Sequence, residues 1–233
     1  MQDRPIVDMI DKIQDTYIGI ENTVDCWLIN LDDFTLKPYY NIQKCNREYV
    51  VLNQREKNQN IPLLRKQIYQ HIISDYLKIP VWDLHIARKS NGKPYIKTDT
   101  YKNVNFNVSH SKQYMLVGIK MNQHIGLDIQ VIHSYHYIKD AYKAILSSCE
   151  LKIYRELNLE EQKDYLFCIW VQKEAIAKAL GLGLLLDFTT FGVSYFSSLG
   201  KFEYLCQEES LGNSFKMSLM KNHLYFYAIA VKL

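Results

Sequence analysis

Apolar and polar positions follow two different periods along the chain. Residues 24–32 (VDCWLINLD) alternate, as a strand with one buried face does, whereas residues 61–79 place apolar side chains at helical spacing. Helical spacing returns over residues 164–180 (DYLFCIWVQKEAIAKAL), and the Gly-Leu-Gly that follows is typical of a helix end. The chain is therefore expected to combine strands with at least two long helices.

The remaining apolar runs predict further strands and short helices. The Asn-Gly pair in ARKSNGKPYI, residues 87–96, predicts a β-hairpin. Residues 135–157 predict one or two helices, with Ser147 or Ser148 as a cap between them. Further strands are expected over residues 104–111, 114–120, 126–132, 188–196, 201–206, 214–220 and 225–233.

This order of elements predicts an α+β fold made of two similar halves. Each half offers strands, a long helix and more strands, and no flexible or low-complexity linker separates them. We expect a boundary near Asn122, with an N-terminal α+β half over residues 1–122 and a C-terminal α+β half over residues 123–233.

Composition and charge exclude several classes of protein. The chain of 233 residues is 48% hydrophobic and 23% charged, with a net charge of +3, which is too mild to argue for nucleic-acid binding. No apolar run suggests a membrane span, and the first residues lack the pattern of a secretory signal, so we expect a cytoplasmic protein. The five cysteines are widely spaced, which argues against a CxxC zinc site and a disulfide framework.

One carboxylate lies in an unusually apolar strand. In IGLDIQVI, residues 125–132, alternation puts Gly126, Asp128 and Gln130 on the face opposite the aliphatic side chains. A carboxylate in apolar surroundings is costly unless it is paired or binds a metal. The simpler alternative is an antiparallel strand with one wet face, on which Asp128 is solvated.

The predicted helix over residues 164–180 carries a second acidic residue on an apolar face. Three-and-four spacing places Glu174 beside Trp170 and Val171, with Lys178 one turn later and Lys173 directly before it. The simpler alternative is an exposed Glu–Lys pair of the kind that stabilises a helix by a few tenths of a kcal/mol.

Two further segments offer groups that suit an anion. Gly92 and Pro94 make the hairpin turn rigid, so Lys93 would project from it as a point charge for a phosphate. In FNVSHS, Ser109 and His110 offer hydrogen-bond donors. The alternatives are a hairpin tip decorated by a lysine and a histidine with a structural role.

The order of these motifs is more specific than any one of them. GKP, FNVSHS, GLDIQ and WxxKEAxxKxxGxG follow one another between about residue 61 and residue 193. In this order and spacing the chain resembles the surfactin-type 4′-phosphopantetheinyl transferase family. The resemblance implies a monomeric pseudo-dimer of two α+β halves, the 4′-phosphopantetheinyl transferase fold, with the active site between the halves.

The same resemblance implies an enzyme, a holo-[acyl-carrier-protein] synthase. Such an enzyme moves the 4′-phosphopantetheine arm of its substrate coenzyme A onto a serine of an apo carrier protein and releases adenosine 3′,5′-bisphosphate. An acyl, peptidyl or polyketide carrier protein would be the partner. The sequence leaves open which carrier it is, and so whether fatty-acid, polyketide or nonribosomal-peptide biosynthesis is served.

The resemblance also implies a metal site that holds Mg²⁺, with Mn²⁺ as an alternative. Asp128 and Glu174 match the family's metal-binding carboxylates, which agrees with the preference of Mg²⁺ for one or two carboxylates plus substrate phosphates and waters. Gln130 departs from the family, which commonly has glutamate there as a further ligand. We expect Gln130 to weaken the affinity for the metal without abolishing the site.

Contacts to coenzyme A are implied for residues of the N-terminal half. Lys93 and His110 match residues that hold the 3′-phosphate of coenzyme A, and Ser109 and Gly92 are expected to line the same pocket. Further candidates, by charge alone, are Arg47, Arg55 and Arg65.

The remaining implied roles fall on the C-terminal half. Lys173 and Lys178 match the lysines that flank the metal-binding glutamate, and they would contact the pyrophosphate. Glu150 falls where the family has its proposed general base, and it would take the proton of the carrier serine. The simpler alternative for Glu150 is a glutamate on a helix surface.

Two rival interpretations remain. Asp128 and Glu174 are also a generic metal pair of a Mg²⁺-dependent nuclease. A common nuclease pattern, however, has a lysine two residues after its second acidic residue, on the same strand. Here the residue two after Gln130 is Ile132, and Glu174 lies on a predicted helix. The second rival is a non-catalytic relative that binds coenzyme A or a carrier protein, which only Gln130 favours.

Overall fold

Two antiparallel sheets form the centre of the protein. The computed structural model describes residues 11–15, 24–31, 61–98, 100–132 and 135–233. The first sheet has the order β1 (Asp11–Asp15), β2 (Val24–Asn30), β6 (Tyr114–Met121), β5 (Val104–Ser111). The second has the order β7 (Ile125–Val131), β10 (Tyr225–Lys232), β9 (Asn213–Lys221), β8 (Gly200–Glu208).

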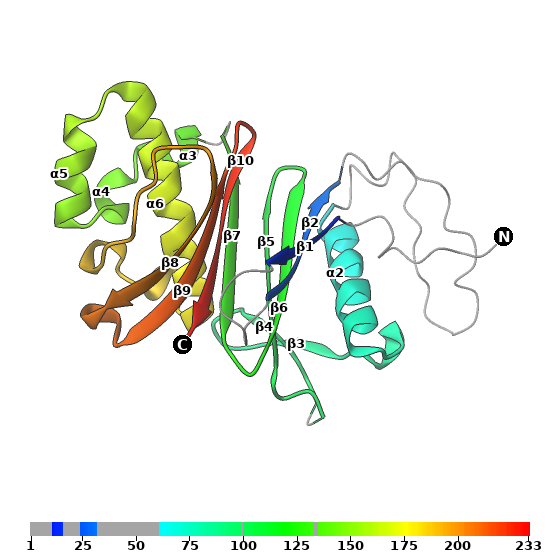
Figure 1. Ribbon diagram of the computed structural model, residues 1–233. Helices are drawn as coiled ribbons and strands as arrows, with labels where there is room; N and C mark the ends of the chain where they lie inside the picture. Colours follow the sequence, from blue (N-terminus) through cyan, green and yellow to red (C-terminus); the bar gives the residue numbers. More distant parts are fainter. Residues whose placement is uncertain (1–10, 16–23, 32–60, 99, 133–134) are drawn as a thin grey trace.

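Each sheet carries a long helix on its outer face, so the molecule has four layers (Figure 1). Helix α2 (Ile61–Leu77) covers the first sheet, and helix α6 (Leu159–Leu180) covers the second. A third apolar cluster, which includes Cys26, Leu116 and Leu127, fills the space between the sheets. The fold is thus the α+β arrangement of two halves that the order of elements predicts.

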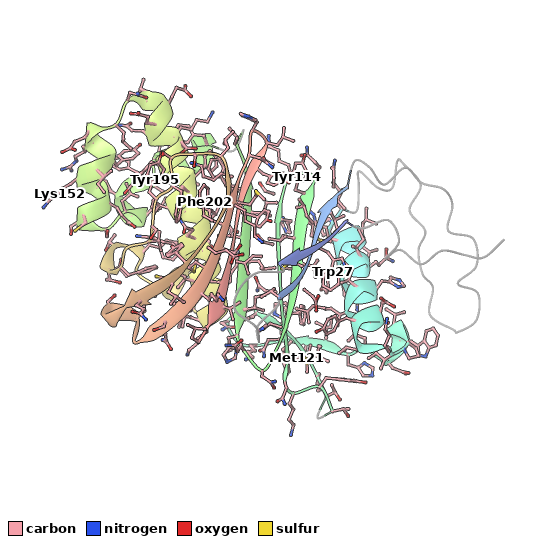
Figure 2. All side chains as sticks on the ribbon, viewed as in Figure 1. Trp27, Tyr114, Met121, Lys152, Tyr195 and Phe202 are labelled. Carbon is pink, nitrogen blue, oxygen red and sulfur yellow. The ribbon has the colours of Figure 1, made fainter. Side chains whose placement is uncertain are left out.

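Side chains pack from the sheets onto these helices. Trp27 of β2 points toward α2 and meets Tyr76 edge to face at 6.3 Å (Figure 2). Between the sheets, Tyr114 and Tyr225 lie with their ring centroids 4.9 Å apart. None of the helices in the described ranges is long and apolar enough to cross a membrane.

Most of the predicted elements are confirmed. The strand expected over residues 24–32 is β2, the helix over residues 61–79 is α2, and the Asn-Gly turn joins the hairpin β3 (Ile86–Arg88) and β4 (Pro94–Ile96). The longest helix is α6, and it ends at Gly181 with a φ of 73°.

The segment between two of these elements is more divided than expected. Residues 135–157 form three short helices, α3 (Tyr135–Lys139), α4 (Tyr142–Ile145) and α5 (Ser148–Glu156), rather than one or two. Ser147 caps α5: its side chain accepts from the Glu150 N–H, and the Glu150 side chain accepts from the Ser147 N–H.

The strand expected over residues 188–196 is wrong. This segment is a 3-10 turn, Phe188–Thr190, followed by extended chain outside both sheets. Side chains take the backbone groups that a neighbouring strand would otherwise bind: the Val193 N–H donates to Glu150, the Ser194 N–H donates to Tyr204, and the Ser194 carbonyl accepts from Gln172. The apolar run predicts a strand, but side chains of α5, α6 and Tyr204 bind its backbone groups, so the segment joins no sheet.

Two edge strands meet where the halves join. Strands β5 and β7 belong to different sheets, yet three side chains of β5 accept hydrogen bonds from backbone N–H groups of β7 and replace the carbonyls of a main-chain ladder. The three pairs are Asn107 Oδ1 with the Leu127 N–H at 2.9 Å, Ser109 Oγ with the Ile129 N–H at 3.3 Å, and Ser111 Oγ with the Val131 N–H at 3.1 Å. We call this set of contacts the side-chain ladder.

Gly126 lets α6 lie directly on β7. A Cβ atom at this position would lie 2.0 Å from the Ala175 carbonyl oxygen and 2.3 Å from the Ala179 nitrogen. Since both atoms belong to the backbone of α6, neither can turn away as a side chain can. The close approach brings Asp128, two residues along β7, against the side chains of α6.

We expect Gly126→Ala to destabilise the protein strongly, because α6 would have to move away from β7. Overpacking of this kind typically costs about 1–3 kcal/mol of unfolding free energy, and a backbone clash belongs at or above the upper end. Gly118→Ala is the matched control, since its Cβ would meet only side-chain ends, among them Leu127 Cδ1 at 2.9 Å. Urea unfolding of both variants measures the difference, and an equal loss would contradict the close packing of α6.

Candidate active site

Asp128 is a buried carboxylate with three side-chain partners. It is 2% exposed, and it lies on the face of β7 that α6 covers. The Lys178 ammonium lies 2.6 Å from Oδ1, the Ser109 hydroxyl donates to the same oxygen at 2.9 Å, and the Gln130 amide donates to Oδ2 at 3.2 Å. The alternative of a solvated carboxylate on a wet strand face is therefore wrong.

Glu174 brings a second carboxylate to the same place. Partial burial first, and then the nearby Asp128 carboxylate, raise the pKa of Glu174 to about 6, while Lys178 acts in the opposite direction. Within the described residues, no hydrogen bond or ion pair holds this carboxylate. Asp128 and Glu174 thus repel one another, and a cation between them would relieve the repulsion.

This donor set fits a hard divalent cation such as Mg²⁺. The described residues hold no cluster of three or more His, Cys, Asp and Glu side chains suited to a metal ion. A site that completes its coordination with substrate phosphates and waters needs only one or two carboxylates, and Asp128 and Glu174 supply two. The chemistry of the site therefore agrees with a metal that binds together with a phosphorylated substrate.

Gln130 lies next to the pair. Its amide nitrogen donates to Asp128, and its amide oxygen accepts from the Ser111 hydroxyl at 3.4 Å. An amide in this place brings no negative charge, so it adds nothing to the repulsion between Asp128 and Glu174. A direct contact between Gln130 and a metal stays a prediction.

Basic side chains lie at the edge of the Asp128 site. His110 is exposed at the end of β5; partial desolvation of its ring, then the charges of Arg65 and Lys178, lower its pKa, while Asp128 raises it. Arg65 reaches this region from α2, where its guanidinium donates to the Lys112 carbonyl. Charge alone had singled out Arg65 in the sequence, and the structure brings it to His110. The charges of Arg65 and Lys178 and the ring N–H of His110, from three elements, suit a phosphate.

Lys93 contacts the C-terminal end of α6, the end that carries Glu174 and Lys178. Its ammonium donates to the carbonyls of Lys178 at 2.5 Å, Ile125 at 3.2 Å and Ala179 at 3.3 Å. Burial lowers its pKa to about 8. Gly92 precedes it with a φ of 81°, which confirms the tight turn. A cation at the last carbonyls of a helix is favourable, so Lys93 fastens the hairpin to α6. Its contact with a phosphate stays a prediction.

Lys173 and Glu150 lie together in the core of the C-terminal half. Lys173 is fully buried and donates to Glu150 Oε2 at 2.5 Å. Its ammonium also donates to the carbonyls of Ile145, Phe188 and Phe191 at 2.9, 2.7 and 2.7 Å. The other Glu150 contacts are with the N–H groups of Ser147 and Val193. All of these partners belong to the C-terminal half, and neither the Lys173 nor the Glu150 side chain contacts Asp128.

Sequence reasoning overlooked the side-chain ladder, although a signal for it was present. Asn107, Ser109 and Ser111 occupy alternate positions of a strand whose other face is apolar. A polar stripe of this kind usually indicates a solvated face, yet these three residues are 4%, 5% and 8% exposed. The sequence could not reveal that another strand edge would cover the stripe.

Family models match both halves of the chain. A model described as 4′-phosphopantetheinyl transferase superfamily matches residues 124–224. A model described as 4′-phosphopantetheinyl transferase, N-terminal, matches residues 27–122. The two matches are adjacent, and together they span both sheets and the side-chain ladder between them.

Individual relatives are more distant. An L-aminoadipate-semialdehyde dehydrogenase-phosphopantetheinyl transferase of Rattus norvegicus is 29% identical over 136 residues, which are 52% of this chain and 42% of that protein. The 4′-phosphopantetheinyl transferase Sfp of Bacillus subtilis is 26% identical over 151 residues, 65% of this chain and 63% of that protein. The chain thus covers less than two thirds of the length of each of these relatives.

One solved structure is also similar. A holo-(acyl-carrier-protein) synthase from Bacillus anthracis, in complex with CoA (3′,5′-ADP), matches with a TM-score of 0.35 and 18% identity, over 47% of this chain and 94% of that one. This likeness is too low to support an argument about the fold. The two adjacent family matches and the ordered motifs from GKP to WxxKEA, by contrast, agree along both halves, and the chain belongs to the 4′-phosphopantetheinyl transferase superfamily.

Proposed function

We propose that this protein transfers the 4′-phosphopantetheine arm of coenzyme A to a serine of an apo carrier protein in a Mg²⁺-dependent reaction. The observation that carries the proposal is the pairing of Asp128 and Glu174 beside Lys178, at the junction of the two matched halves. In the reaction, the serine oxygen forms a bond to the β-phosphorus, and the bond from that phosphorus to the bridging oxygen breaks. Adenosine 3′,5′-bisphosphate leaves with the bridging oxygen, and the serine proton passes to a base.

Asp128 and Glu174 would hold the metal, with the pyrophosphate oxygens and waters as its other ligands. When bound, Mg²⁺ neutralises charge on the pyrophosphate and stabilises the charge that develops on the leaving group. Lys178 supports the same charge from the helix side, since its ammonium lies 2.6 Å from Asp128 and is partly accessible. Arg65 supplies positive charge, and His110 a hydrogen-bond donor, for the phosphates at the edge of the site.

Lys173 and Glu150 receive a different role from the one expected. Because they bind each other and the backbone of the C-terminal half, we propose that this pair holds α5 and residues 188–193 against α6. This role replaces the pyrophosphate contact of Lys173 and the proton transfer by Glu150. In this proposal, a group at the Asp128 site or a water molecule accepts the proton of the carrier serine.

Intact-mass analysis of an apo carrier protein incubated with this protein, coenzyme A and Mg²⁺ tests the proposal directly. We expect the carrier to gain one phosphopantetheine. Asp128→Ala should slow the transfer by about 100-fold or more, because the metal loses a ligand. Asp75→Ala is the control, since Asp75 of α2 pairs with the exposed Lys78, directly after the helix, and with no other side chain of the described residues. Binding of coenzyme A without transfer to any of several carriers would instead favour a non-catalytic relative, as Gln130 suggests.

The raised pKa of Glu174 makes a prediction about stability. The folded protein binds the Glu174 proton more tightly than the unfolded chain, so its contribution to folding is most favourable below pH 4.5 and is lost as the pH rises to about 6. A shift of this size corresponds to about 2 kcal/mol. We therefore expect Glu174→Gln to stabilise the metal-free protein at pH 7.5 and to have little effect near pH 4.5.

Urea unfolding in the presence of a chelator, from pH 4.5 to 7.5, measures this difference. Added Mg²⁺ should stabilise the wild type more than Glu174→Gln, because the variant lacks one of the two carboxylates. A stabilisation of the variant that does not depend on pH would show that the glutamate ionises normally.

Lys173 and Lys178, both on α6, are expected to respond differently to the same substitution. Lys173→Met leaves the buried Glu150 carboxylate unpaired, and breaking such a pair typically costs about 3–5 kcal/mol of unfolding free energy. Lys178→Met should reduce stability less, since Ser109 and Gln130 still donate to Asp128, but slow the transfer by about 100-fold. Melting curves and transfer rates of both variants separate the two roles; similar stabilities would contradict them.

A further inference from the structure

Ser109 is a residue of the N-terminal half whose side chain contacts Asp128 and Lys178 of the C-terminal half. It lies on β5 and is 5% exposed. Its hydroxyl donates to Asp128 Oδ1 at 2.9 Å, accepts from the Lys178 ammonium at 3.1 Å, and accepts from the Ile129 N–H at 3.3 Å. One hydroxyl group therefore joins the metal-binding carboxylate, the adjacent cation and the backbone of β7.

These three contacts use the full hydrogen-bonding capacity of the hydroxyl. A serine offers one donor and two acceptor positions, and each has a partner. The hydroxyl has no donor left for a phosphate oxygen, so the pocket for the 3′-phosphate of coenzyme A, expected from the sequence, does not account for Ser109. Its neighbour His110 is exposed on the other face of the strand and is free of these contacts with Asp128.

The contacts also fix the orientation of the carboxylate. Ser109 and Lys178 both bind Oδ1, and Gln130 binds Oδ2, so the plane of the Asp128 carboxylate is held from both sides. Lys178 and Gln130 are side chains of the half that carries the site. Ser109, by contrast, belongs to the N-terminal half and to the side-chain ladder. The orientation of the Asp128 carboxylate therefore depends on how β5 is placed against β7.

We propose that Ser109 is a positioning residue that orients Asp128 for the metal and, through the side-chain ladder, makes the metal site depend on both halves. The inference rests on the metal site of the proposed function. Partners of this kind typically change metal affinity by about 10- to 100-fold when they are removed. Ser109 is thus assigned to the metal ligand rather than to coenzyme A.

Mn²⁺ alone provides a probe that does not depend on turnover. Titration of the full-length protein with Mn²⁺, followed by the electron paramagnetic resonance signal of the free ion, gives the affinity directly, with and without coenzyme A. We expect Ser109→Ala to weaken Mn²⁺ binding by about tenfold or more. The KM for coenzyme A at saturating Mn²⁺ should remain close to that of the wild type.

Asn107→Ala is the matched control. Asn107 belongs to the same ladder and binds the Leu127 N–H, but it makes no contact with the charged group. The control should therefore lose stability, as Ser109→Ala does, and keep its Mn²⁺ affinity. Equal losses of Mn²⁺ affinity in the two variants would show that Ser109 acts only by joining the sheets, and would overturn the proposal.

Ser109→Thr keeps the hydroxyl, and it is expected to restore Mn²⁺ binding even if the alanine variant does not fold. A folded threonine variant with wild-type stability and weakened Mn²⁺ binding would contradict the proposal. A variant that loses coenzyme A affinity but keeps Mn²⁺ affinity would return Ser109 to the phosphate pocket. Failure of the wild type itself to bind Mn²⁺ or to transfer would overturn the proposed function, on which the inference rests.

Discussion

The contact between the edge strands β5 and β7 is the constraint on which the site depends. An edge strand presents backbone N–H groups that need partners, and leaving them buried without any is costly. Here alternate side chains of β5 supply the acceptors, so the two sheets join without merging into one. This solution leaves polar side chains in the junction, and one of them, Ser109, is also the partner of Asp128.

In the C-terminal half, side chains also donate hydrogen bonds to the backbone of a segment that lies outside the sheets. Residues 188–199 run outside the sheets, and their backbone groups are bound by side chains of α6 and β9. Lys173 binds carbonyls at the start of the segment, Gln172 binds one in the middle, and Lys221 binds the Phe196 carbonyl further along. Lys221 is itself 1% exposed and pairs with Asp164. Buried lysines thus serve as structural donors on one side of α6, while Lys178 on another face serves the site.

Two carboxylates that repel one another, Asp128 and Glu174, lie close together at the site. Asp128 is paired, but Glu174 is close enough to repel it, and this repulsion adds to the larger effect of burial in raising the pKa of Glu174. A cation that binds between them gains this energy on binding. Gln130, where the family commonly has a third carboxylate, adds no negative charge beside this pair. In the proposed metal site it would bring less charge to the cation than a third carboxylate.

The sequence by itself determined the elements and the identity of the charged residues, because both are local properties. The periods of apolar residues predicted β2, α2, the hairpin and α6, and the ordered motifs singled out Asp128, Glu174 and Lys178. Only the tertiary structure decided which residues share a place. Lys173 and Lys178 look equivalent along the chain, yet one is fully buried with Glu150 and the other contacts Asp128. Residues 188–196 read as a strand because the side chains that bind their backbone leave no periodic trace in the sequence, and the packing of β5 against β7 likewise decides that Ser109 lies beside Asp128.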